Sequence, residues 1–277
     1  MSEFLQFASE RGLIIDHLVY GKWARVPTVD HPHKKNGAYW FGDEFGHCQN
    51  WALMDRVESW SDGKERTPAQ QKQLTDRIEA SRVAYANERK QRQLKAAEKA
   101  SWILSQAELR KHPYLDRKGF PDLLCNTWRD LLVIPMRLGD KICGCQMISA
   151  DGEKKFLTGQ RTNDSSFRIG NGTKNFIVEG YASGLSLNAI LRAINVPASI
   201  HVSFSCGNAA RIAKTLPDAI WIADHDKSGA GQTAAKESGL KWWMPEKEGD
   251  DINDFYLKVG LFKSSQAIKK FLTKQQG

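Results

Sequence analysis

The stretch "NFIVEGYASGLSLNAILRAINVPASIHVSF", residues 175–204, decides the fold of the C-terminal part of the chain. Two short apolar runs flank a segment whose Leu, Ala and Ile residues recur at helical spacing. Strand, helix and strand in turn predict a βαβ crossover and therefore a mostly parallel sheet. The same alternation continues to residue 260. Further strands are predicted at 219–226 and 240–245, and further helices at 208–216, 229–239 and 252–260.

Acidic residues follow three of these predicted strands. An ionised carboxylate at the end of a buried strand costs free energy unless something needs its charge. Because open α/β sheets bind their ligands where the carboxyl ends of the strands meet, we expect these acids to converge there. They are Glu179, Asp224, Asp226, Asp250, Asp251 and Asp254.

Carboxylates without His or Cys among them favour a hard cation, Mg²⁺ or Mn²⁺, over zinc. After the second acidic group, Lys227, Gly229 and Gly231 lead into a predicted helix, whose free backbone N–H groups could hold a phosphate. Each part also has a structural reading, because an acid between a strand and a helix often serves only as a helix cap.

The chain ahead of this section divides into three predicted parts. Residues 1–62 are rich in aromatic residues and turn signals, which predicts a small β-rich domain with a hairpin over 37–53. Residues 63–111 hold no glycine from residue 64 on and only one proline near their start, which predicts one or two long helices as a linker. Residues 112–172 contain short predicted strands at 131–138, 141–149 and 154–159.

The overall charge of the 277-residue chain is +8, with a pI of about 9.2, which fits an anionic partner. The segment from Lys64 to Lys111 holds twelve basic and six acidic residues. It reads either as a solvated linker, which we favour, or as a basic rod near nucleic acid. We expect no signal peptide or membrane span, a cytoplasmic location, and reduced thiols at the five cysteines.

Three acidic segments carry a family resemblance. "FIVEG", "IADHDKSGAGQTAA" and "GDDINDF" resemble the three acidic motifs of the TOPRIM domain, which bacterial-type primases, topoisomerases and some nucleases share. Together with "HPYLDRKGF" and the "IPM...CQMISADGEKKFLTG" stretch, they are similar to the TOPRIM primases of phages and conjugative plasmids over residues 112–257. The resemblance implies a TOPRIM catalytic domain at 173–277, with mixed α/β and α+β architecture, preceded by a small mixed primase subdomain at 112–172.

The resemblance also implies roles for single residues. Glu179 matches the invariant TOPRIM glutamate and would be a metal ligand or a proton acceptor. Asp224 and Asp226 match the DxD metal ligands, and Asp251 and Asp254 match the later acidic pair, with Asp250 as its neighbour. A basic surface for the template or nucleotide would include Arg117, Lys118, Lys154, Lys155 and Arg161.

The function implied is that of a DNA primase, which makes short RNA primers on single-stranded DNA from ribonucleoside triphosphates for phage, plasmid or mobile-element replication. No GxxxxGK[ST] motif is present, so a separate helicase or replication protein is an expected partner. Two other functions stay open: a metal-dependent TOPRIM nuclease, and a non-catalytic single-strand-binding accessory protein.

The N-terminal part departs from cellular primases because it has no zinc ribbon. His31, His33, His47 and Cys48 lack ribbon spacing, so zinc is not expected. The aromatic residues of this part form the core of a small domain or stack on template bases, and we favour the core for most of them. They are Tyr39, Trp40, Phe41 and Trp51.

Overall fold

A computed structural model describes residues 3–54, 56–227 and 229–273. The chain divides into two compact units, residues 1–90 and 91–277. The finer division at residues 62, 111 and 172 stays a prediction.

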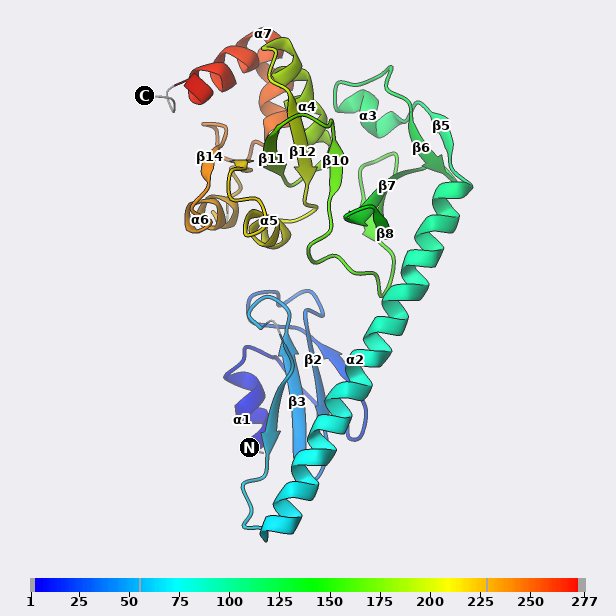
Figure 1. Cartoon of the computed structure of the whole chain (residues 1–277), viewed down its shortest axis with the longest axis vertical. Coiled ribbons are helices and arrows are strands. Elements are labelled where there is room, and N and C mark those ends of the chain that lie inside the picture. Colours follow the sequence, from blue (N-terminus) through cyan, green and yellow to red (C-terminus); the bar gives the residue numbers. More distant parts are fainter. Residues whose placement is uncertain (1–2, 55, 228, 274–277) are drawn as a thin grey trace. The chain divides into compact units, whose positions relative to one another are not determined.

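The first unit is built on a four-stranded antiparallel sheet in the order β1-β2-β3-β4 (Figure 1). The predicted hairpin over 37–53 is confirmed as β2 paired with β3. Its small core contains Phe4, Leu13 and Cys48 among others. The elements of this sheet and the helix ahead of it are α1 (Glu3–Ser9), β1 (Ala24–Val26), β2 (Gly37–Phe41), β3 (Phe45–Asn50) and β4 (Glu58–Ser61).

The aromatic residues of this hairpin belong largely to the core. Tyr39 has no exposed surface, and its hydroxyl donates to the backbone oxygen of His17. Trp40 and Phe41 are half-buried against other rings. The reading that we favoured, a place in the core, is confirmed for Tyr39, which is therefore not available to stack on a template base. Trp51 is half-buried, with the Arg25 guanidinium 4.1 Å from its ring.

Gly46 lies inside strand β3 and not in the turn that the sequence indicates. A Cβ at this position would come within 2.4 Å of the Phe4 ring, so the glycine lets α1 pack directly on the sheet.

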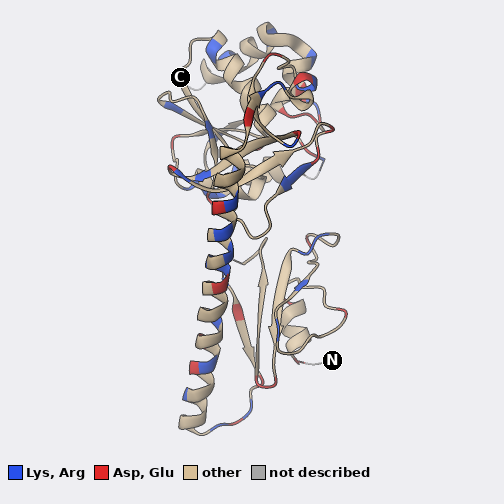
Figure 2. Cartoon of the chain, turned by 90° about the vertical axis from the view of Figure 1, so that its right-hand side faces the viewer, with Lys and Arg blue, Asp and Glu red and all other residues tan. Residues whose placement is uncertain are grey.

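One long helix, α2 (Pro68–Ser105), confirms the helical prediction for this part of the chain. Lys or Arg and Asp or Glu recur along its length (Figure 2). The helix contributes to the packing of both units, because Leu74 and Tyr85 are buried in the first unit and Ala100 and Ile103 in the second.

The second unit contains a five-stranded antiparallel sheet in the order β5-β6-β7-β8-β9. Val133, Cys145 and Leu157 pack with Ala100 and Ile103 of α2. The two longest strands, β7 and β8, match the predicted 131–138 and 141–149 closely. The elements are β5 (Glu108–Arg110), α3 (Pro113–Arg117), β6 (Cys125–Trp128), β7 (Leu131–Leu138), β8 (Lys141–Ile148) and β9 (Lys154–Phe156).

The second sheet of this unit has the order β10-β12-β11-β13-β14, and only the β10–β12 pair is antiparallel. The predicted parallel sheet is therefore confirmed. Helices α4 and α7 pack on one face, and α5 and α6 pack on the other (Figure 1). The strands are β10 (Phe167–Ile169), β11 (Lys174–Val178), β12 (Ala198–Val202), β13 (Ile220–Ile222) and β14 (Lys241–Trp243). The helices are α4 (Tyr181–Ala193), α5 (Cys206–Ala213), α6 (Ala230–Glu237) and α7 (Ile252–Thr273).

Two elements differ from the sequence prediction in length. Strand β13 ends at Ile222, so Asp224 and Asp226 lie in the loop after it and do not share one face of a strand. The last helix continues to Thr273 across a kink at Gly260, whose φ of 76° is not helical. The sequence prediction stopped at this glycine because glycine commonly ends helices.

The two sheets of the second unit share one hydrophobic core. Leu132, Ile134 and Ile148 of the antiparallel sheet belong to the same buried cluster as Phe176 and Val178 of β11. The relative placement of the two sheets is thus fixed by buried apolar contacts.

Four of the five cysteines are buried and Cys206 is half-buried, and all five are free thiols, as expected. In the residues that the structure describes, no helix combines the length and the apolar character needed to cross a membrane.

Candidate active site

The topology of the parallel sheet places its acidic residues at a crevice. The chain leaves β11 toward β12 on one side and leaves β13 toward β14 on the other side, so adjacent β11 and β13 form the topological switch point. Open α/β sheets bind ligands at this point, outside the carboxyl ends of the strands. Glu179 directly follows β11, and Asp224 follows β13 by two residues.

Glu179 and Asp224 are the two most perturbed carboxyl groups of this crevice. Burial, followed by the charge of Asp226, raises the pKa of Glu179 to about 7. Burial, followed by the charges of Glu179 and Asp251, raises the pKa of Asp224 to about 8. One buried oxygen of each, Glu179 Oε1 and Asp224 Oδ1, has no hydrogen-bond partner among the residues that the structure describes. Like charges held this close need a cation or a proton between them.

Gly231 brings helix α6 against these acids. A Cβ at Gly231 would stand 2.9 Å from the backbone oxygen of Asp224 and 3.7 Å from Glu179 Oε1. Gly229, with a φ of 67°, is the N-cap of this helix and gives no side-chain cap. The predicted pair of glycines therefore lies next to the acids, at the start of α6.

Asp251 and Asp254 also reach this region, but each has a structural partner. Asp251 is the residue before α7, and its Oδ1 accepts from the Asp254 backbone N–H at 2.8 Å, while Asp254 Oδ2 accepts from the Asp251 N–H at 3.3 Å. This reciprocal arrangement is a capping box. Asp251 Oδ2 also accepts from the Ser183 hydroxyl at 3.2 Å, and Asp254 lies 3.7 Å from the Lys118 ammonium group. Asp250 is buried and forms an ion pair with Lys258.

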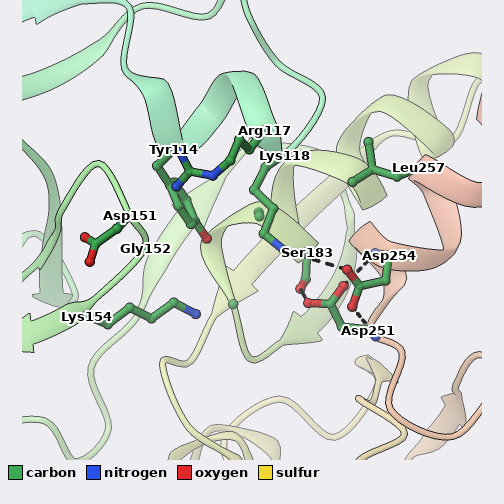
Figure 3. Close-up of a pocket in the computed structure, with 12 residues that line it drawn as sticks. Tyr114, Arg117, Lys118, Asp151, Gly152, Lys154, Ser183, Asp251, Asp254 and Leu257 are labelled. Atoms are coloured by element: carbon green, nitrogen blue, oxygen red, sulfur yellow. Dashed lines mark hydrogen bonds and ion pairs between the residues drawn. The ribbon is translucent and has the colours of Figure 1, made fainter.

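Beside the acids, a cavity of about 460 Å³ opens between α3, the β8–β9 turn and the starts of α4 and α7 (Figure 3). Three of its lining residues are basic, Arg117, Lys118 and Lys154, and three are acidic, Asp151, Asp251 and Asp254. Gly180 and Ser183 at the start of α4 also line it, and this helix has no side-chain cap. Cations together with a helix N-terminus make the cavity favourable for anions such as phosphate groups.

Lys154 connects the cavity with the acidic crevice. Its side chain extends into the cavity from the side opposite to Asp251 (Figure 3). The positive charge of Lys154 also lowers the pKa values of Glu179 and Asp224. Burial and the neighbouring carboxylates raise both values by more. The acids and the basic cavity are therefore neighbouring parts of one site.

Other predicted basic residues lie elsewhere. Lys155 is on the opposite face of β9 from Lys154 and forms an ion pair with Glu153 at 2.9 Å. Arg161 forms an ion pair with Asp164 at 2.7 Å. Lys227 is exposed in the loop after Asp226. None of these three lines the cavity.

Three residues of this region were missed by the sequence prediction. Tyr114 and Ser183 line the cavity, and Cys206 starts helix α5 beside Glu179. Burial, followed by Asp251, raises the pKa of Tyr114 to about 12. The sequence does contain a signal for Ser183. A helix that follows a strand-end acid is expected to start at the same crevice, and Ser183 lies in the first turn of that helix.

Magnesium fits these side chains in part. Glu179 and Asp224 each offer a buried oxygen without a partner, and Asp226 adds a third carboxylate nearby. Across residues 3–54, 56–227 and 229–273, no set of three His, Cys, Asp or Glu side chains is arranged to hold a metal ion by itself. Mg²⁺ is commonly held by one or two carboxylates with water and substrate phosphates completing its shell. The adjoining basic cavity offers a place for such phosphates.

Comparisons with known proteins give a similarity at the level of solved structures. No family model matches the chain, and a search of curated proteins gives no significant match. A solved structure similar to the chain is the crystal structure of a DNA primase domain from Pseudomonas aeruginosa, at 16% sequence identity and a TM-score of 0.36. The match covers 64% of this chain and 58% of that structure, which is less than two thirds of its length. The similarity is weak, so the case for a function rests on the residues of the site.

Proposed function

We propose that the chain is a TOPRIM-type DNA primase, which joins ribonucleotides on a single-stranded DNA template with the help of Mg²⁺ or Mn²⁺. The observation that carries the proposal is the meeting of two features at the switch point of a parallel sheet. Buried carboxylate oxygens that lack a hydrogen-bond partner among the described residues lie beside a cavity to which Arg117, Lys118 and Lys154 contribute positive charge. A site that joins nucleotides must bind a cation and several phosphate groups side by side, and this pairing of charges offers both.

The roles of the residues follow from their positions. Glu179, Asp224 and Asp226 would hold the metal, which when bound stabilises the negative charge that develops on the phosphate being transferred. Glu179 serves the same centre as a ligand or as the acceptor of the 3′-hydroxyl proton. Arg117, Lys118 and Lys154 would bind the phosphates of the nucleotide or of the template. Asp251 and Asp254 orient the start of α7 and hold Lys118 beside the cavity.

Two other functions use parts of the same site. A metal-dependent nuclease could place water against a phosphodiester with the same carboxylates. A single-strand-binding accessory protein would need only the basic residues. The buried acids favour the primase over the accessory protein. Such acids weaken nucleic-acid binding unless a metal neutralises them, and an accessory protein that only binds a strand has no use for them.

One assay separates the three functions. The purified protein is incubated with single-stranded DNA, ribonucleoside triphosphates and Mg²⁺, and the products are resolved by size. New short RNA is the expected result. Shortened DNA would support the nuclease, and a mobility shift without any product would support the accessory protein.

A pair of charge-removing variants tests the assignment of the acids. Asp224→Asn and Asp226→Asn should each lower RNA synthesis at least a hundredfold while DNA binding stays within about twofold, since removing a metal ligand removes stabilisation of the transition state. Asp218→Asn is the matched control, because this exposed residue lies before β13, at the opposite end of the same strand. Normal synthesis by Asp224→Asn would refute the site.

A further inference from the structure

A pair of aromatic side chains stands beside the acids and is used by none of the roles above. The rings of Phe156 and Phe204 meet edge to face, with centroids 6.4 Å apart and planes at 83°. They come from different sheets, Phe156 from the edge strand β9 and Phe204 from the turn between β12 and α5. Phe156 is 42% exposed, whereas Phe204 is half-buried against the shared core.

Strand β9 places Phe156 on the same face as Lys154. Residues two apart in a strand point to the same side, and their partners on β8 are Gln146 and Ile148, both buried. Ile148 belongs to the core shared with the parallel sheet, so this face of β9 is turned toward that sheet. The exposed ring is therefore next to a cation that lines the cavity.

The backbone holds Phe204 next to Glu179. The Phe204 N–H donates to the backbone oxygen of Glu179 at 2.9 Å, and the preceding Ser203 N–H donates to the oxygen of Val178 at 2.8 Å. Phe204 has a φ of 68°, a left-handed conformation that bulky residues rarely adopt. A disfavoured backbone that keeps an aromatic ring at a fixed place beside an acidic crevice indicates a positional role for that ring.

We infer that Phe156, supported edge-on by Phe204, is a stacking platform for the base of the nucleoside triphosphate. The inference rests on the proposed function, because it takes the basic cavity as the place of the phosphates. A nucleotide whose phosphates lie against Lys154 would have its sugar and base within reach of the exposed ring two residues further along β9. Stacking on a phenylalanine accepts any of the four bases, so the platform would bind nucleotides without choosing among them.

The inference is tested by separating the base from the phosphates. Binding of ATP and of inorganic triphosphate to the full chain is measured calorimetrically with Mg²⁺ and without DNA. The wild type should bind ATP more tightly than triphosphate. Phe156→Ala should weaken ATP binding roughly tenfold, in keeping with the contribution of one base stack, and leave triphosphate binding unchanged.

Further variants keep the test decisive. Phe156→Trp should retain ATP affinity and Phe156→Leu should not, which separates stacking from apolar bulk and provides a conservative substitution if the alanine variant folds poorly. Phe262→Ala is the matched control, because Phe262 is a 73% exposed phenylalanine on α7. The Phe156→Ala variant should bind GTP, CTP and UTP more weakly than the wild type does, and to a similar extent for each.

Several outcomes would overturn the inference. The first is an equal affinity of the wild type for ATP and for triphosphate. The second is an equal loss of affinity for both ligands in Phe156→Ala. The third is a loss of affinity that Phe156→Ala shows only for an oligo(dT) strand titrated in the same way, which would assign the ring to the template. Failure of the proposed function is seen separately. If the wild type binds ATP through Phe156 but makes no RNA, the stacking platform is supported and the proposed primase function is rejected.

Discussion

At the scale of single residues, the acids of the crevice store unfavourable free energy in the folded protein. The pKa of Asp224 is about 8, against an ordinary value of 3.8. Between these two pH values the folded protein keeps a proton that the unfolded chain has released. The free energy of unfolding therefore decreases as the pH rises through this window, unless a cation neutralises the charge.

Asp224→Asn should stabilise the protein while removing its activity. At pH 8 without Mg²⁺ we expect the free energy of unfolding to rise by on the order of 2 kcal/mol, because one of the buried like charges is gone. At pH 4 the difference should nearly vanish. Thermal melts at both pH values, with Asp218→Asn as the control, measure this. A lower melting temperature at pH 8 would contradict the prediction.

His47 shows the opposite dependence on pH. This histidine on β3 has no exposed surface, and burial, followed by the charge of Arg82, lowers its pKa from 6.5 to about 4. Between pH 6.5 and 4 the unfolded chain takes up a proton that the folded chain refuses, so stability is complete above pH 6.5 and is lost as the pH falls.

We therefore expect the first unit to lose roughly 2 kcal/mol of its free energy of unfolding between pH 7 and pH 4 through His47. His47→Gln, which can still bond to Ser59, should remove this part of the pH dependence. His33→Gln, at an exposed position, should leave it intact. Denaturant melts at several pH values give the result, and identical pH profiles for the two variants would disprove the assignment.

At the scale of elements, helix starts bring the two halves of the site together. The uncapped start of α4 and the capping box of α7 border the same cavity, and the Ser183 hydroxyl joins them through Asp251. Asp251 thus has a packing role that explains an acid at this position without any metal.

Two substitutions at Asp251 separate the packing role from a metal role. Asp251→Ala should lower the free energy of unfolding by about 1 kcal/mol, because α7 loses its N-cap. Asp251→Ser keeps a capping oxygen without the charge, so its stability should stay close to the wild type. If Asp251→Ser makes RNA at the normal rate, Asp251 acts only as a cap. If its synthesis collapses while its melting temperature holds, the carboxylate itself is needed.

The sequence predicts elements well where the periodicity is long and unbroken. Helix α2 follows from its composition, which lacks glycine and has a proline only near its start, and strands β7 and β8 and the alternation after residue 174 follow from short apolar runs between turn or helical segments. Strand β10, with three residues, carries too little pattern to be recognised, and the half of α7 beyond Gly260 is hidden by the glycine. The sequence could predict that Glu179 and Asp224 follow neighbouring parallel strands, because each comes directly after an apolar run, whereas their role as a site stays a prediction. The cavity could not be predicted, because it depends on how α3 packs near helices that lie about 70 residues and more further along the chain.

At the scale of the whole molecule, the chain combines a charge of +8 with a local cluster of acids. Basic residues attract the phosphates of a nucleic acid by releasing counterions, which makes binding weaker as salt is added. Under the proposed function, the acids would act against this attraction until a metal neutralised them. Net charge and metal would then act together on the affinity for a strand.

Binding of single-stranded DNA should weaken steeply with salt, and Arg117→Ala and Lys154→Ala should each reduce the log–log slope by about one unit or less. Lys141→Ala is the control, since Lys141 starts β8 at the end away from Ile148, the partner of Lys154. Fluorescence anisotropy with a labelled oligonucleotide at several salt concentrations measures the slope. An equal change in all three variants would show that the cavity residues have no special part in strand binding.

The hydrophobic core shared by the two sheets of the second unit has a consequence for how such a protein can change over time. Ile134 and Ile148, behind the basic residues, and Phe176 and Val178, behind the acids, form one buried cluster. A recombination event that joined either sheet to a foreign partner would leave a mismatched apolar surface and a chain that folds badly. The sheet that carries Lys154 and the sheet whose strands end at the acids are therefore expected to be inherited as a pair, with changes arising by substitution at the rim of the site and not by exchange of modules.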